Sequence, residues 1–211
     1  MADAKCKICR RAGEKLFLKG DKCLTPKCVF EKKPSPPGKP LSERKHRSSV
    51  TEYGTQLREK QKIKNVYGLR KKQFSGYVEQ AMAVKGGNPV DRLFQRLEHR
   101  LDNIVFRLGL AHSRAHARQI VSHGHICVDG IRSTIPSMFV HSGSKITVRE
   151  GSQSSPQFNT KGVEGGGVKR TPPNWLSWTA DKLKGEVSGT AKYDKGETGF
   201  DYQQVIEFYS R

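Results

Sequence analysis

Four of the five cysteines lie within the first 28 residues, as the pairs Cys6-x2-Cys9 and Cys23-x4-Cys28. Two thiolate pairs separated by a loop of about a dozen residues are typical of a tetrahedral structural zinc site. The segment around them is short and basic, so a bound ion would stabilise it in place of an adequate core. We expect one structural Zn2+, held by Cys6, Cys9, Cys23 and Cys28. An iron–sulfur cluster is the alternative that four cysteines also accept.

The charge of the chain limits its partners. It has 39 Lys and Arg against 20 Asp and Glu, a formal net charge of +19. Such an excess repels itself unless a polyanion neutralises it, so nucleic acid or an anionic membrane is the expected partner. No run approaches the roughly 20 apolar residues of a membrane span, and the N-terminus has no apolar signal region. We therefore predict a cytoplasmic, nucleic-acid-binding protein with no membrane partner.

Composition divides the chain into five parts. Residues 1–47 contain four of the cysteines and a Pro-rich segment at 34–40. This segment can form neither a helix nor a sheet ladder, so we expect a stiff, extended linker. Residues 48–87 follow a helical pattern, with breaks expected near Gly54, Gly68 and Gly76. Residues 88–150 form a separate module, and the Gly- and Ser-rich residues 151–174 predict a flexible connection. The last part, 175–211, is near neutral and aromatic, which favours packing against protein.

The helical part carries a run of one charge. Residues 56–74 contain seven basic side chains and one acidic side chain, Glu59. A solvated helix face usually mixes charges of both signs, so we interpret this run as an RNA contact.

Residues 88–150 predict a compact module of two helices and a small sheet. Asn88 and Pro89 are good residues for the start of a helix, and apolar residues then recur at helical spacing as far as Leu108. A second helix is predicted from Ser113 to His123, closed by Gly124, followed by strands at 126–131 and 145–148. The fold class is α+β and multi-domain. Arginines lie beside the apolar faces of both helices: Arg92, Arg96, Arg100 and Arg107 on the first, Arg114 and Arg118 on the second.

No catalytic residues are predicted. His112 and His116 lie one helical turn apart, and His123 and His125 follow, but no carboxylate or cysteine completes a metal site near them. Because Arg114 and Arg118 are neighbours, hydrogen bonding to phosphate or helix capping is the better interpretation. The chain has no nucleophile elbow, phosphate-cradling loop or paired carboxylates, so no small-molecule substrate is expected.

Several motifs resemble those of the bacterial small-subunit ribosomal protein S-four family, in its four-cysteine, zinc-binding branch. They are residues 53–62 (YGTQLREKQK), 100–109 (RLDNIVFRLG), 113–125 (SRAHARQIVSHGH) and 207–211 (EFYSR). The resemblance covers residues 6–148 and the last few. Residues 151–200 depart from it. The family usually has a helix before the Trp175-Leu176 pair, and here that stretch is rich in Gly and Ser.

The resemblance implies a structural protein of the small ribosomal subunit. Family members bind the five-way junction in the first domain of small-subunit rRNA early in assembly, line the mRNA entry channel and affect decoding accuracy through neighbouring small-subunit proteins. Their C-terminal segment, here 175–211, packs back on the helical domain. Contact with a neighbouring protein is expected from Glu207, Phe208 and Tyr209. Contact with RNA is expected from Arg58, Lys60, Lys62, Lys64, Arg70, Lys72, Arg92, Arg96, Arg100, Arg107, Ser113, Arg114, Arg118, Gln119, His123 and His125.

Two other classes of protein fit the sequence less well. An RNA-modifying or aminoacylating enzyme that carries the αα-β module as an appendage would need a catalytic domain of well over 100 residues, for which no room remains. A zinc-ribbon transcription factor would need a DNA-reading helix and an acidic activation segment or a dimerisation stripe, which the sequence does not offer.

Overall fold

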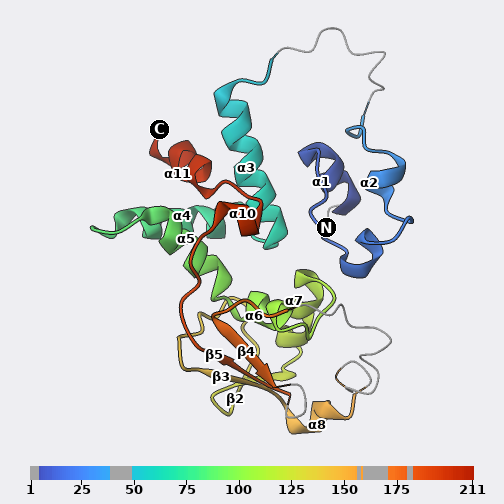
Figure 1. Cartoon of the computed structure of the whole chain (residues 1–211), viewed down its shortest axis with the longest axis vertical. Helices are drawn as coiled ribbons and strands as arrows, with labels where there is room; N and C mark the ends of the chain where they lie inside the picture. Colours follow the sequence, from blue (N-terminus) through green and yellow to red (C-terminus); the bar gives the residue numbers. More distant parts are fainter. Residues whose placement is uncertain (1–4, 39–48, 156–157, 159–170, 180–182) are drawn as a thin grey trace. The chain divides into compact units, whose positions relative to one another are not determined.

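The structure is a computed structural model that describes residues 5–38, 49–155, 158, 171–179 and 183–211 (Figure 1). The chain divides into two compact units. Unit 1 comprises residues 1–93 and 194–211, and unit 2 comprises residues 94–193. No helix in the described part of the chain is long and apolar enough to cross a membrane.

Unit 1 is entirely helical where it is described. It begins with the short helices of the cysteine segment and continues with two long helices, to which the C-terminal helices are added. The elements are α1 (Lys5–Ala12), η1 (Gly20–Cys23), α2 (Val29–Lys32), α3 (Glu52–Val66), α4 (Lys71–Ala83), the start of α5 (Pro89–Glu98), α10 (Lys195–Thr198) and α11 (Tyr202–Ser210).

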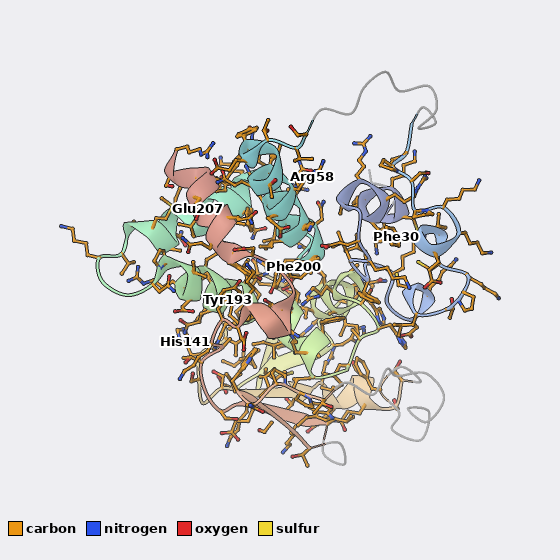
Figure 2. The ribbon with its side chains drawn as sticks, turned by 45° about the horizontal axis from the view of Figure 1, so that its top comes forward. Phe30, Arg58, His141, Tyr193, Phe200 and Glu207 are labelled. Carbon is orange, nitrogen blue, oxygen red and sulfur yellow. The ribbon has the colours of Figure 1, made fainter. Side chains whose placement is uncertain are left out.

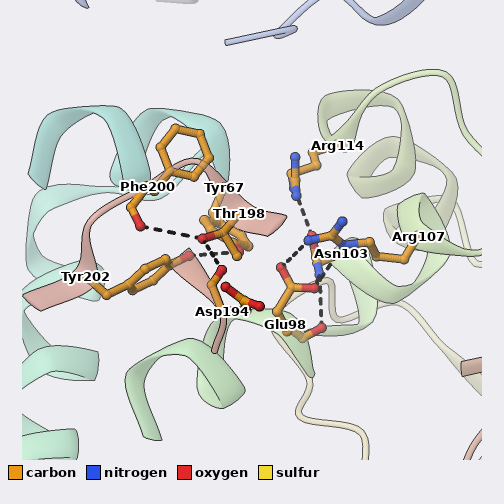
Figure 3. A network of polar contacts seen from close by, with 9 residues as sticks. All are labelled: Tyr67, Glu98, Asn103, Arg107, Arg114, Asp194, Thr198, Phe200 and Tyr202. Atoms are coloured by element: carbon orange, nitrogen blue, oxygen red, sulfur yellow. Dashed lines mark hydrogen bonds and ion pairs between the residues drawn. The ribbon is translucent and has the colours of Figure 1, made fainter. Parts of the chain in front are cut away.

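The core of unit 1 joins α3 and α4 to α11, which lies beside α3 in Figure 1. Ile63, Phe74 and Val205 are fully buried there. The hydroxyl groups of Tyr67 and Tyr202 lie 3.1 Å apart in a buried hydrogen bond (Figure 3). Because a buried hydroxyl is costly without a partner, this bond favours one docking position of the C-terminal helix.

Unit 2 combines helices α6 (Leu101–Arg107), α7 (Arg114–Ser122) and α8 (Glu150–Gln153) with a five-stranded antiparallel sheet of order β2-β1-β3-β5-β4. Ile126 and Ile146 point from the sheet into one core with Ile104 and Val121 of the helices. The predicted α+β class is confirmed. The strands are β1 (Ile126–Val128), β2 (Ile131–Ser133), β3 (Lys145–Val148), β4 (Leu176–Thr179) and β5 (Lys184–Val187).

The continuous helix predicted from Pro89 to Leu108 is wrong: it breaks between α5 and α6. Arg100 is extended (φ −71°, ψ 138°), and its backbone bridges Phe139. The N–H groups of Leu101 and Asp102 donate to the carbonyls of Met138 and Pro136, at 2.9 and 3.0 Å. The loop thus takes two donors that a continuous helix would bond internally.

The C-terminal part divides differently from the prediction. Residues 176–187 form β4 and β5 at the edge of the unit 2 sheet, so only residues from Asp194 onward group with the helical unit. Gly54 and Gly76 lie within α3 and α4 and do not interrupt them. Most of the predicted flexible connection lies outside the described residues, but α8 and the buried Phe158 fall within it.

Candidate nucleic-acid interface

Helix α7 presents the polar residues of the RNA-contact prediction. Ser113 caps it, with its hydroxyl accepting from the His116 N–H at 3.2 Å. The side chains of Arg118, Gln119 and His123 are exposed. Gln119 and His123, the C-cap residue, are four residues apart and share one face of the helix, whereas Arg118 lies about 100° away from Gln119 around its axis. Nη1 of Arg118 lies 3.9 Å from the Oδ2 atom of Asp102.

Arg100 lies on the inside of unit 2. Its side chain is 1% exposed and grips Asp102 with two hydrogen bonds of 3.0 and 2.7 Å. The sequence predicts Arg100 at the RNA surface, but the structure turns its guanidinium inward because the break between α5 and α6 redirects it. RNA contact by Arg100 would require the ion pair to open.

A polar network holds two further arginines of the prediction (Figure 3). Arg107 donates to both carboxylate oxygens of Glu98, at 2.9 and 2.8 Å, and the Asn103 amide donates to the same carboxylate at 3.1 Å. Nε of Arg114 donates to the side-chain oxygen Oδ1 of Asn103 at 2.8 Å. The guanidinium carbon of Arg114 lies 4.4 Å from the centroid of the Phe106 ring. Glu98 is 1% exposed, so the network fixes both guanidinium groups before any ligand binds.

Arg92 and Arg96, two further arginines of the predicted RNA contact, differ in their exposure. Arg92 donates to the carbonyls of Ala81 and Val84, at 3.0 and 2.6 Å, and so caps the C-terminal end of α4. Arg96 is exposed, and its guanidinium carbon lies 5.1 Å from the centroid of the Phe139 ring. Arg96 is therefore the residue of this pair that the structure leaves at the surface.

The histidines pair with one another. The rings of His112 and His116 stack at 5.6 Å, and burial, together with the charge of His112, lowers the pKa of His116. His123 is exposed, whereas the Nδ1 of His125 lies 2.9 Å from the Ser152 hydroxyl. Of the two histidines predicted to contact RNA, only His123 is presented freely.

The basic run of unit 1 also contains both exposed side chains and side chains held by other residues. Arg58, Arg70 and Lys72 are exposed, and Lys64 is half-buried. Lys62 forms ion pairs with Glu59 at 2.7 Å and Glu14 at 3.1 Å. Burial alone would lower the pKa of Lys62, but these hydrogen bonds raise it.

Lys60 differs from the rest of the run, because the structure buries it. Its ammonium lies over the rings of Phe208 and Tyr209, 4.2 and 4.5 Å from their centroids. The sequence predicts Lys60 at the RNA surface, but its place within the helical packing gives that prediction no support.

The three residues predicted to contact a neighbouring protein pack on the chain itself. Glu207 accepts from the Gln56 amide at 3.3 Å, the Phe208 ring lies 5.4 Å from that of Tyr53, and Tyr209 packs on Phe74. All three stay half-buried. Figure 2 shows Glu207 on α11.

The N-terminal cysteines are grouped. Cys9, Cys23 and Cys28 are buried and Cys6 is half-buried. Burial raises the pKa of Cys9, and charge on Cys23, Cys6 and Cys28 adds to this, so the four thiols share one neighbourhood. Within the described ranges, no three or more His, Cys, Asp or Glu side chains are arranged as a closed metal-binding group. The donor set suits zinc chemically, because thiolate is its preferred structural ligand.

The predicted RNA contact does not include two exposed basic residues of α1. Lys7 and Arg11 are exposed and lie four residues apart on α1, so they project from one face. That spacing is visible in the sequence, but the cysteines between and around these residues directed the interpretation to metal binding.

The sequence matches two known protein families. Residues 1–98 match the family described as the ribosomal protein S4/S9 N-terminal domain, and residues 99–146 match the S4 domain. The chain is 44% identical over 209 residues to the small ribosomal subunit protein uS4 of Syntrophomonas wolfei, which covers 99% of this chain and 98% of that protein. It is 45% identical over 210 residues to uS4 of Dehalococcoides mccartyi, covering 99% and 97%.

Fold, charge and the S4 domain define a ribosomal RNA-binding protein. The chain belongs to the ribosomal protein S4 (uS4) family. Members of this family are structural proteins of the small ribosomal subunit in the cytoplasm, and the prediction that the chain is not an enzyme is confirmed.

Proposed function

We propose that the chain binds the five-way junction in the first domain of small-subunit rRNA and so nucleates assembly of the subunit. One observation carries this proposal: Arg118, Gln119 and His123 are exposed on α7 and its C-cap, in the unit where an internal network holds the guanidinium groups of Arg107 and Arg114 in place. Folded RNA is recognised mainly through its backbone and shape, which suits exposed guanidinium groups on a rigid support.

The test is binding of the purified protein to the junction RNA, with an unrelated structured RNA of similar length as competitor, across a salt series. If about eight phosphates are neutralised, the logarithm of the binding constant falls with the logarithm of the salt concentration at a slope of about −6. Preference for the junction that persists at physiological salt supports the proposal. Equal binding to both RNAs, lost as salt rises, contradicts it.

The proposal includes one Zn2+ held by Cys6, Cys9, Cys23 and Cys28. The burial of three of these thiols and the contribution of the other three cysteines to the raised pKa of Cys9 support it. When bound, the ion would link the two cysteine pairs and stabilise a segment that has few buried apolar residues.

Elemental analysis of the purified chain tests the metal. We expect one zinc per chain, lost in Cys9→Ser and retained in the control Cys127→Ser, whose thiol lies in β1. Iron with visible absorbance would identify the iron–sulfur alternative, and metal-free protein with an intact fold contradicts both. Limited proteolysis after chelation gives a second readout, because loss of the ion should expose residues 5–38 to cleavage.

The family resemblance extends the proposal to the mRNA entry channel and to decoding accuracy. The half-buried Glu207, Phe208 and Tyr209 leave part of α11 accessible to a neighbouring small-subunit protein. Stop-codon readthrough in cells carrying Glu207→Ala tests this contact, with Gln80→Ala, at an exposed position of α4, as control. A change in readthrough for Glu207→Ala alone supports the contact, and equal readthrough in the two strains contradicts it.

A further inference from the structure

A basic hollow lies between α1 and α3 within unit 1. Its volume is about 480 Å³. Five of its nine lining residues are basic, two carry amides, two are apolar, and none is acidic or aromatic. The lining residues are Lys7, Ile8, Arg11, Ala12, Arg58, Gln61, Lys62, Lys64 and Asn65.

Both walls of the hollow follow from helical spacing. Lys7 and Arg11 are four residues apart on α1, and Arg58, Gln61 and Asn65 are three and four residues apart on α3. Residues at these steps share a face, so each helix turns a polar, basic face toward the other. Figure 2 shows Arg58 projecting from α3.

The charges of the hollow are largely uncompensated. Lys62 is the exception, because it pairs with Glu14 from the N-terminal segment and with Glu59 of α3. Among the described residues, Lys7, Arg11, Arg58 and Lys64 form no ion pair. Four like charges across one hollow repel one another, so closure of α1 on α3 is more favourable when an anion lies between them.

The lining indicates the chemical class of the anion. Guanidinium groups match the oxygens of a phosphate with two parallel hydrogen bonds, and the amides of Gln61 and Asn65 add neutral donors. The lack of an aromatic wall gives a nucleobase nothing to stack on, so a backbone suits the site better than a base.

We propose that this hollow binds backbone phosphates of RNA, so that the cysteine segment and the helical part of unit 1 hold one stretch of RNA between them. The inference rests on the proposed function, because it takes the RNA of that function as its ligand. It adds Lys7 and Arg11 to the contact, and RNA would strengthen the packing of the N-terminal segment on α3.

The test compares two charge-matched triple variants of the full chain. The hollow variant is Lys7→Gln, Arg11→Gln, Arg58→Gln, and all three of its positions are exposed. The control variant replaces Lys32, Lys33 and Lys85 with Gln, which are exposed positions of unit 1 outside the hollow. We expect the salt slope of RNA binding to become shallower by about 2 to 3 in the hollow variant, since each phosphate contact contributes roughly 0.7 to 0.9. The control should change the slope by less than about 1.

The variants also address folding and protease sensitivity. Urea unfolding of both triple variants establishes that they are folded. A separate double variant, Arg11→Lys with Arg58→Lys, keeps the charge of the hollow and should retain most of the salt slope of RNA binding. RNA should protect residues 5–38 from proteolysis in the wild type and in the control, and not in the hollow variant. An unchanged slope in the hollow variant, or an equal loss in the control, overturns the proposal.

Two further arms separate the possible causes. The slopes are measured on the junction RNA and on the unrelated structured RNA, so absence of a preference in the wild type rejects the proposed function while the slopes still decide the hollow. Inorganic phosphate is titrated into the RNA-free protein. Saturable binding that disappears in the hollow variant while its RNA slope is unchanged assigns the hollow to a small anion and overturns the RNA assignment.

Discussion

The ammonium nitrogen of Lys60 lies 4.2 Å from the centroid of the Phe208 ring, and 4.5 Å from that of Tyr209. Burial lowers the pKa of Lys60, and the charges of Lys71 and Lys64 lower it further. This lysine of the basic run therefore joins α11 to α3 through cation–π contacts. The last helix of the chain is held on a charged group that the sequence alone assigns to RNA.

Truncation of the aromatic partner should loosen this contact. Phe208→Ala removes the cation–π contact and the packing on Tyr53, and we expect it to lower the free energy of unfolding by about 2 kcal/mol, less than a fully buried Phe would cost. Urea unfolding measures the change. The control is Gln203→Ala, at an exposed position of the same helix, with an expected effect within about 0.5 kcal/mol. A loss in Phe208→Ala no larger than that in the control would mean that the contacts of Phe208 contribute little to stability.

The buried carboxylate of unit 2 should be far more sensitive than a surface one. Glu98→Ala leaves Arg107 and Asn103 without their shared acceptor, and we expect a loss of roughly 3 kcal/mol or more. Arg211→Ala breaks the exposed pair with Glu52 and should cost less than about 1 kcal/mol. Chemical denaturation of both variants provides the comparison, and a small effect of Glu98→Ala would show that water replaces its contacts.

Local signals predicted the local structure. Ser113 and Gly124 bound α7 as the capping rules require, and Gly124 has a φ of +75°, which suits glycine. Asp129 and Gly130, with φ of +51° and +83°, form the turn between β1 and β2 that their sequence indicates. These features depend on neighbours within a few residues, which the sequence displays.

Long-range features were not predictable in this way. The apolar spacing continues through His99 and Arg100, but the chain breaks there because a loop near Met138 supplies carbonyl acceptors from far along the sequence. Strands β4 and β5 are missing from the prediction because Gly- and Ser-rich residues before them indicated a connection. Burial of Lys60 and Arg100 was also missed, since a count of charges does not say which side chains turn inward.

The stability of unit 2 should depend on pH through His99. Its Nδ1 lies 2.9 Å from the Val140 carbonyl, which can only accept, and its Nε2 accepts from the Ala191 N–H at 3.2 Å. The buried ring is therefore neutral, with the proton on Nδ1. Burial lowers its pKa, and the bond to Val140 only partly offsets this.

Because the folded pKa lies below the unfolded value of about 6.5, the unfolded chain binds more protons in the interval between them. Stability is therefore complete above about pH 6.5 and falls as pH drops through that interval, by at most about 1.4 kcal/mol per pH unit. His99→Gln should flatten this dependence in urea unfolding of the RNA-free protein. His116, whose pKa burial also lowers, contributes with the same sign, so His116→Gln is measured beside it. A slope that survives both substitutions would assign the dependence to other groups.

Arg118 and Arg100 should separate RNA binding from stability. Arg118 is exposed, so Arg118→Gln should leave the free energy of unfolding within about 0.5 kcal/mol of the wild-type value and reduce the salt slope of RNA binding by about 1. Arg100→Gln strands the buried Asp102 carboxylate and should cost about 3 kcal/mol or more in unfolding. Under conditions where Arg100→Gln stays folded, its salt slope should equal that of the wild type. A shallower slope for folded Arg100→Gln would mean that RNA opens the Arg100–Asp102 pair, and the arginine would then belong to the interface that the sequence predicted.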